Sequence, residues 1–293
     1  MCRPDSEDID PLPTDRRLYV VGASRGGMRL AESTWTDVRD ADVDVAVVPV
    51  GSTEQHGPHA PLGTDTLNAV AVADAAASEY GSRPRSGVAN GVPRGEVVVT
   101  PPVPIGVAEE HRAFDGTLWV SPDTFRAYVR ETAASLTAHG IDRVVFANGH
   151  GGNVEALAEV ARRFSRDPEH DGYAVAFTWF ESVGEHASEM GHAGPLETAL
   201  LRATNGDLVH EDRIEEASEG AADRWGRWVS GVNLAHDSAE FTDNGVVGDP
   251  SDGSAELGAE LLEHASDALA ELLRAVVDRD VAGTAALDER PDE

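Results

Sequence analysis

Histidines and carboxylates cluster in a polar loop that follows one hydrophobic segment of the chain. Residues 44–50 are hydrophobic, and the loop after them, GSTEQHGPHAPLGTD, carries Glu54, His56, His59 and Asp65. Glu54 and His56 are two residues apart, so in an extended segment their side chains leave the same face. Carboxylates and imidazoles together suit a divalent metal ion. The loop therefore predicts a metal site, although such residues are also common on a solvated surface.

Two further segments combine histidine with glycine. NGHGGN at 148–153 contains His150, and GHAGPLET at 191–198 contains His192 and Glu197. The glycines beside His150 permit positive φ and a close approach of the backbone to a ligand. A Gly-rich turn could also hold a phosphate, but this one lacks the GxGxxG spacing and the lysine of a P-loop. Three separate segments that each combine histidine with glycine are hard to explain as unrelated surface features, so we expect them to form one site.

In this order and spacing, the motifs resemble the creatininase family of metal-dependent amidohydrolases. The resemblance rests on GSTEQHGPHAPLGTDT, PPVPIGVAEEHRAFDGTLWV, NGHGGN and GHAGPLET, and it spans the chain from Met28 to the late 270s. It implies two divalent ions per subunit (zinc, iron or manganese) with a bridging hydroxide. It also implies that Asp65 bridges the two ions, and it assigns metal binding to Glu54, His56, Asp65 and His150.

The resemblance implies hydrolysis of a small-molecule amide by a metal-activated water. His192 is the candidate proton shuttle to the leaving nitrogen, because imidazole titrates near neutral pH. Glu197 is either a further metal ligand with a catalytic role or a carboxylate that orients a ligand histidine, and a charge at a helix N-terminus would also explain it. The residues expected to contact the substrate are His59, His111, Gly116, Thr117, Asn148, Gly151, Gly152 and Asn153.

Two departures from the creatinine-hydrolysing members bear on the substrate. Those enzymes use a metal-binding glutamate where this chain has Gly152, and a tryptophan where it has Ser188. The chain is more similar to the archaeal branch that removes a formyl group from a formylaminopyrimidine nucleotide in riboflavin and deazaflavin synthesis. The alternatives are creatinine hydrolysis, trimming of a peptide in redox-cofactor maturation, and metal binding without turnover.

Strands and helices alternate along the chain, so that each motif follows a strand. Strands are expected at 44–50, 96–100, 143–147 and 173–180, and helices at 65–79, 121–139, 153–165 and 254–277, with Thr64 capping the first of these helices. The alternation favours a three-layer α/β/α sandwich with a mostly parallel central sheet, as the resemblance to creatininase also implies. The site should lie where the parallel strands end.

We expect one amidohydrolase domain at 28–280. A flexible extension or misassigned start should precede it at 1–27, and a flexible acidic tail should follow at 281–293. Cys2 is the only cysteine, which excludes an intrachain disulfide. The chain shows neither a signal-peptide pattern nor an apolar run of membrane-spanning length, so we expect a cytoplasmic protein. The resemblance implies a homo-oligomer, specifically a hexamer.

The chain is strongly acidic, with a formal charge of −30 and no lysine. This charge argues against affinity for nucleic acids or anionic membranes. Acidic residues are spread through the chain, which is typical of adaptation to high salt, where ions screen their repulsion. A GC-rich genome would explain the missing lysine but not so large an excess of acid.

We predict that the melting temperature rises between low salt and molar KCl, because screening relieves repulsion among the acidic side chains. Calorimetry across a KCl series measures the effect. A melting temperature that stays constant or falls would contradict adaptation to high salt.

Overall fold

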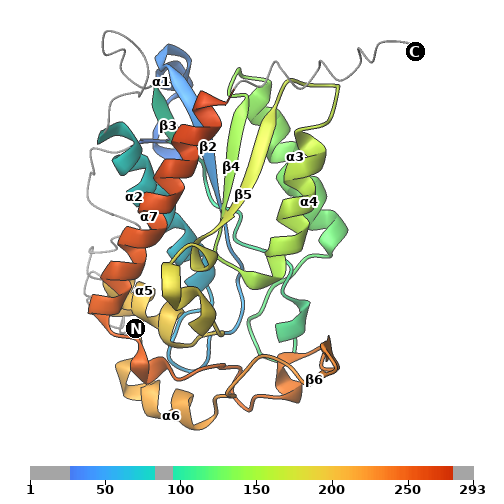
Figure 1. Cartoon of the computed structure of the whole chain (residues 1–293), viewed down its shortest axis with the longest axis vertical. Helices are drawn as coiled ribbons and strands as arrows, with labels where there is room; N and C mark the ends of the chain where they lie inside the picture. Colours follow the sequence, from blue (N-terminus) through green and yellow to red (C-terminus); the bar gives the residue numbers. More distant parts are fainter. Residues whose placement is uncertain (1–26, 83–94, 280–293) are drawn as a thin grey trace, which may run out of the picture.

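A five-stranded parallel sheet forms the centre of the computed structural model, which describes residues 27–82 and 95–279 (Figure 1). Its strands are β1 (Met28–Arg29), β2 (Val43–Val50), β3 (Glu96–Val99), β4 (Arg143–Asn148) and β5 (Tyr173–Thr178). They lie in the order β1-β3-β2-β4-β5, and every neighbouring pair is parallel. The predicted α/β fold with a parallel central sheet is therefore confirmed.

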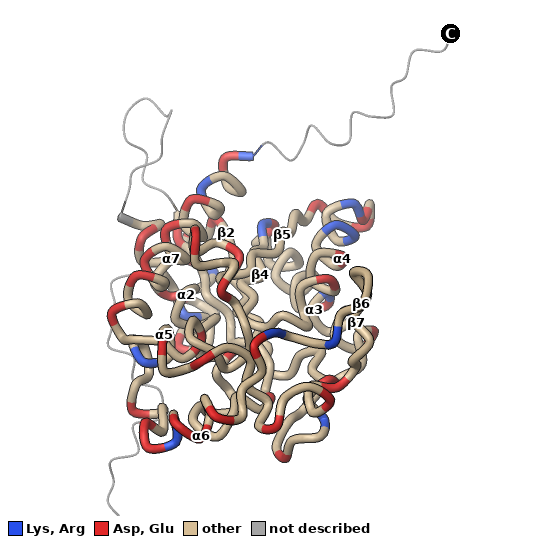
Figure 2. Tube along the Cα trace, turned by 60° about the horizontal axis from the view of Figure 1, so that its bottom comes forward, with Lys and Arg blue, Asp and Glu red and all other residues tan. Residues whose placement is uncertain are grey.

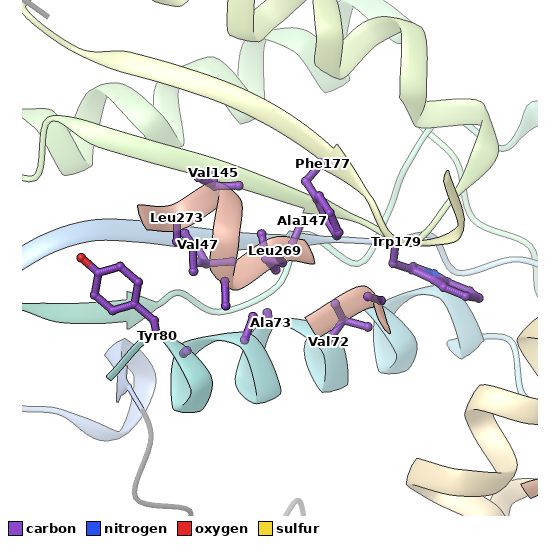
Figure 3. Close-up of a cluster of buried hydrophobic side chains, with 14 of the residues drawn as sticks. Val47, Val72, Ala73, Tyr80, Val145, Ala147, Phe177, Trp179, Leu269 and Leu273 are labelled. Atoms are coloured by element: carbon purple, nitrogen blue, oxygen red, sulfur yellow. The ribbon is translucent and has the colours of Figure 1, made fainter. Parts of the chain in front are cut away.

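Helices cover both faces of this sheet (Figure 1). One face packs on α2 (Thr64–Ser82), α5 (Pro195–Asn205) and α7 (Ala255–Asp278), and the other on α3 (Pro122–Thr137) and α4 (Val154–Phe164). In β2, Val47 points into the first core and Val48 into the second. Figure 3 shows Leu269 and Leu273 of α7 beside Val47 in the first core. Because both of its faces are buried, β2 is hydrophobic almost throughout.

Most helix boundaries follow local capping signals. The side chains of Ser121 and Ser254 accept hydrogen bonds from amides in the first turns of α3 and α7, and Thr34 forms a capping box at α1 (Trp35–Asp40). Thr64 does not cap as predicted, because it is the first residue of α2 and its hydroxyl donates to the Pro61 carbonyl. The expected strand 173–180 ends at Thr178, where the chain enters a 3-10 helix.

The segment 207–245 contains α6 (Ile214–Glu219) and a small hairpin of β6 (Trp228–Val229) and β7 (Val232–Asn233). These elements and α5 lie toward the same end of the molecule (Figure 1). The extension expected at 1–27, apart from Gly27, and the tail expected at 281–293 lie outside the described residues.

Acidic residues are distributed over most elements of the fold, including α2, α6 and α7, whereas basic residues are few (Figure 2). Among the described residues, no helix is both long enough and apolar enough to cross a membrane. Acidic residues are therefore spread over the described part of the fold and are not gathered in one segment.

Candidate metal centre

The three sequence motifs meet where β2 and β4 end. Loops after these strands and the first turns of α2 and α5 supply the side chains, so residues far apart in sequence become neighbours. The structure brings together all six residues predicted to bind metal or act in catalysis, each at most 6% exposed: Glu54, His56, Asp65, His150, His192 and Glu197. Three triads have ligand atoms within 4.8 Å of one another: Glu54–His111–His192, His56–His192–Glu197 and Glu54–His56–Asp65.

Glu54 is a buried carboxylate with few hydrogen-bond donors around it. Neither of its oxygens has a hydrogen-bond partner among the described residues. Three ring nitrogens surround its Oε1: Nδ1 of His150 at 3.1 Å, Nε2 of His111 at 3.4 Å and Nδ1 of His192 at 3.6 Å. Burial raises the pKa of Glu54 to about 7, because the charged form loses its hydration. A buried carboxylate among imidazoles fits a divalent cation well.

Backbone carbonyls hold three of the histidine rings. Nδ1 of His56, Nε2 of His150 and Nε2 of His192 lie 3.1, 2.8 and 2.7 Å from the carbonyl oxygens of Glu54, Val107 and Gln55, respectively. A carbonyl only accepts, so each ring donates its N–H there. In the neutral ring the other nitrogen must then carry a lone pair.

Those lone pairs face carboxylate oxygens. Nε2 of His56 lies 3.0 Å from Asp65 Oδ1, and Nδ1 of His150 lies 3.3 Å from Asp65 Oδ2. Two acceptors at such distances repel each other unless a proton or a metal ion lies between them. Backbone hydrogen bonds that fix ligand histidines in this way are typical of metal sites. The residues present therefore fit metal ions, with Asp65 between the two rings as a bridging carboxylate would be.

The pKa values of Asp65, His56 and His150 differ from the ordinary ones, because these charged side chains interact with their neighbours. Burial alone would raise the pKa of Asp65, but the charges and hydrogen bonds of His56 and His150 outweigh it and lower that pKa. Burial alone would lower the pKa of the His56 and His150 rings. The charge of Asp65 nevertheless raises the pKa of His56 well above its ordinary value, and the charge of Glu54 does the same for His150. Without metal, protons on these rings balance the carboxylates.

His111 and His192 behave differently. Burial, together with neighbouring histidines, lowers the pKa of His111 to about 3 and that of His192 well below its ordinary value. Both rings are therefore neutral near pH 7. They stack on each other with centroids 4.3 Å apart. The lowered pKa of His192 differs from the titration near neutral pH on which its predicted shuttle role is based, so the neutral ring is a weaker proton acceptor than expected.

Glu197 is tied to the loop that precedes it. Its Oε2 accepts a hydrogen bond from the Ala193 amide at 2.6 Å and lies 3.8 Å from Nε2 of His56. Ala193 adopts a φ of +52°, a left-handed conformation uncommon for residues other than glycine. Direct ligation and the orienting of His56 both remain predictions for Glu197.

The predicted substrate contacts divide into three groups. Four of them hold loops through hydrogen bonds: Thr117 to the Gln55 amide, Asn148 to the His150 backbone, Asn153 to Gly51 and Val107, and His59 to Thr198. Gly116, Gly151 and Gly152 are exposed, whereas His111 is part of the metal centre. Contact with a substrate stays a prediction for all eight.

Three residues outside the predicted set also line the centre. The Trp225 ring lies 5.5 Å from that of His111 and 6.0 Å from that of His192. Glu110 Oε1 lies 3.7 Å from Nε2 of His150. A Cβ added at Gly152 would lie 2.8 Å from this same Glu110 oxygen. In the sequence, Gln55 lies between Glu54 and His56, and Glu110 precedes His111, so their positions beside predicted site residues were a usable signal. No local sequence signal indicated Trp225.

Comparison with known proteins identifies the family to which the chain is similar. A family model described as "Creatininase: Creatinine amidohydrolase" matches residues 31–273. The mycofactocin precursor peptide peptidase of Mycobacterium ulcerans is 32% identical over 243 residues, which cover 83% of this chain and 86% of the relative. The creatinine amidohydrolase of Pseudomonas putida is 27% identical over 209 residues, which cover 63% and 75%. A crystal structure of a putative creatinine amidohydrolase from Bacteroides fragilis superposes with a TM-score of 0.72 at 26% identity, covering 87% and 98%.

We predict that His150→Ala and Asp65→Ala each lower bound metal and abolish turnover, the second more severely, since Asp65 faces both ligand rings. His192→Ala should keep its metal but lose roughly 10²- to 10⁴-fold in turnover, as expected for a lost general acid or base. Metal analysis beside rate measurements tests this, with the exposed His139→Ala as control. Full metal occupancy in Asp65→Ala would contradict a bridging role, and metal loss in His192→Ala would make that residue a ligand.

We also predict that zinc affinity rises steadily from pH 6 to pH 8. The raised pKa values of His56 and His150 keep these rings protonated in the metal-free protein, so zinc must displace protons, and it does so more easily as pH rises. Chelator competition gives the affinity at each pH, and calorimetry in buffers of different ionisation enthalpy counts the released protons. Affinity that is independent of pH would contradict ligation by these two rings.

Proposed function

The chain belongs to the creatininase family of metal-dependent amidohydrolases and is a hydrolase of carbon–nitrogen bonds; we propose that its substrate is a short peptide, cleaved at one amide bond. The observation that carries the chemistry is the set of three carbonyl-anchored histidines whose lone pairs face Asp65 and Glu54. The peptide substrate is supported by the Mycobacterium ulcerans peptidase, which matches most of this chain.

Divalent ions held by Glu54, His56, Asp65 and His150 would supply an activated water and polarise the amide carbonyl. The chain's own groups complete the reaction. His192 is neutral near pH 7, and its Nε2 is fixed on the Gln55 carbonyl, so Nδ1 faces the centre. It takes a proton from the attacking water and returns it to the leaving nitrogen, which lets the amide bond break.

The surroundings of the centre support access for an extended chain. Gly151 and Gly152 are exposed, and a Cβ at Gly151 would meet no atom within 4 Å. Trp225 lies beside His111 and His192 and offers an aromatic surface for a substrate side chain. Gly152 and Ser188 replace two residues of the creatinine-hydrolysing members, which disfavours creatinine as the substrate.

Deformylation of a formylaminopyrimidine nucleotide, in riboflavin or deazaflavin synthesis, is our second candidate. It was favoured by the sequence motifs, but the relatives described above are a peptidase and creatinine amidohydrolases, and none is a deformylase. For this reason we place peptide hydrolysis first.

We further propose that the chain assembles into a homo-oligomer, specifically a hexamer. The hairpin and the residue after it leave a group of side chains, each close to half exposed or more, that could be covered by a neighbouring subunit: Trp228, Val229, Val232 and Leu234. Light scattering at high salt measures the mass, and a monomer would refute assembly.

Three substrates separate the candidate reactions. Protein loaded with zinc, manganese or iron is incubated with a mycofactocin precursor peptide, a formylaminopyrimidine nucleotide and creatinine, and mass spectrometry follows peptide fragments, formate and creatine. We expect peptide fragments from the wild type and none from Asp65→Ala. Formate without fragments would favour deformylation, and no product from fully metal-loaded protein would indicate metal binding without turnover.

A further inference from the structure

We propose that Gln55 is a positioning residue that sets the tautomer of His111, so that this ring presents an N–H, not a lone pair, to Glu54. The inference concerns the metal centre of the proposed function and follows from the directions of hydrogen bonds. Gln55 is buried between the predicted ligands Glu54 and His56.

Two backbone groups fix the orientation of the Gln55 amide. The Gly57 N–H donates to Gln55 Oε1 at 2.9 Å, and Gln55 Nε2 donates to the Gly245 carbonyl at 3.0 Å. Exchanging the amide nitrogen and oxygen would place donor against donor and acceptor against acceptor. Glycine at 245 is needed here, because its φ is +86° and a Cβ would lie 1.9 Å from Gln55 Oε1. The amide therefore has one favourable orientation.

The same amide determines which nitrogen of His111 carries the proton. Gln55 Nε2 lies 2.8 Å from His111 Nδ1, so its second N–H donates to that nitrogen. Nδ1 must then be an acceptor, and in the neutral ring the proton lies on Nε2. Nε2 lies 3.4 Å from Glu54 Oε1, so this N–H lies on the Glu54 side of the ring, although the pair does not have hydrogen-bond geometry. Ser238 Oγ is also 3.1 Å from Nδ1, but its hydroxyl has the Glu110 carbonyl as an acceptor at 3.0 Å.

Gln55 gives His192 the opposite orientation. Its backbone carbonyl accepts from Nε2 of His192, so the lone pair on Nδ1 faces the same Glu54 oxygen. The two stacked rings thus offer Glu54 one donor and one lone pair. This difference matters because Glu54, His111 and His192 have ligand atoms within 4.8 Å of one another and could otherwise hold an ion. With Nε2 protonated, His111 cannot be a ligand of an ion beside Glu54.

Nitrogen NMR of the full-length, zinc-loaded protein labelled with ¹⁵N-histidine tests the proposal directly. The His111 signals are identified by their loss in His111→Asn. We expect Nε2 of His111 to carry the proton in the wild type. In Gln55→Glu, a carboxylate acceptor should draw the proton to Nδ1 and expose a lone pair on Nε2. Zinc bound per chain should then rise by one ion.

Controls keep the outcome decisive. Ser238→Ala should leave the tautomer unchanged, and Gln55→Met, which neither donates nor accepts, should give a mixture of tautomers even if Gln55→Glu fails to fold. A wild-type His111 protonated on Nδ1, or a Gln55→Met protein with an unchanged tautomer, would overturn the proposal. The ring signals do not depend on turnover, so an inactive protein with the expected tautomer would count against the proposed function and not against this inference.

Discussion

Two buried carboxylates without enough hydrogen-bond donors constrain the whole centre. Placing a carboxylate in a protein interior costs several kcal/mol unless a positive charge or donors compensate it. Glu54 and Asp65 are almost fully buried, and three of their four oxygens have no hydrogen-bond partner among the described residues. Positive charge must therefore be supplied, either by protons on His56 and His150 or by metal ions that replace them. The same physical requirement explains the shifted pKa values and the predicted rise of zinc affinity with pH.

The fold meets this requirement through its parallel sheet. Helices bury both faces of the sheet, so the polar chemistry can lie only where strands end and loops begin. Asp65 and Glu197 occupy the first turns of α2 and α5, where the helix dipole favours negative charge. Backbone carbonyls from three loop residues then orient the rings. Displacement of one of these loops would rotate the histidine ring that its carbonyl holds, so the geometry of the site depends on the fold.

The structure shows what surrounds Gly152, one of the two positions at which the chain departs from the creatinine-hydrolysing members. Position 152 carries no side chain, and a Cβ there would lie 2.2 Å from the Val107 carbonyl oxygen, 2.5 Å from His150 Nε2 and 2.8 Å from Glu110 Oε1. These atoms occupy the space that a side chain would need. Ser188 supplies no aromatic ring, whereas Trp225 approaches His111 and His192 from a different segment. The Glu110 carboxylate and the Trp225 ring therefore lie near the centre but come from other parts of the chain.

The sequence by itself determined the features that depend on local spacing. The alternation of strands and helices predicted the parallel α/β fold, capping residues such as Ser121 and Ser254 marked helix starts, and the motifs identified the six residues that converge. Only the tertiary structure decided which nitrogen of each histidine is free, that Gln55 contacts both His111 and Gly245, and that Trp225 joins the site. It also decided that Thr64 lies within its helix. Apart from the local bonds of Thr64 to Pro61 and of His56 to Glu54, these outcomes depend on hydrogen bonds and ring contacts between residues tens to hundreds of positions apart. Local propensity carries no information about such distant contacts.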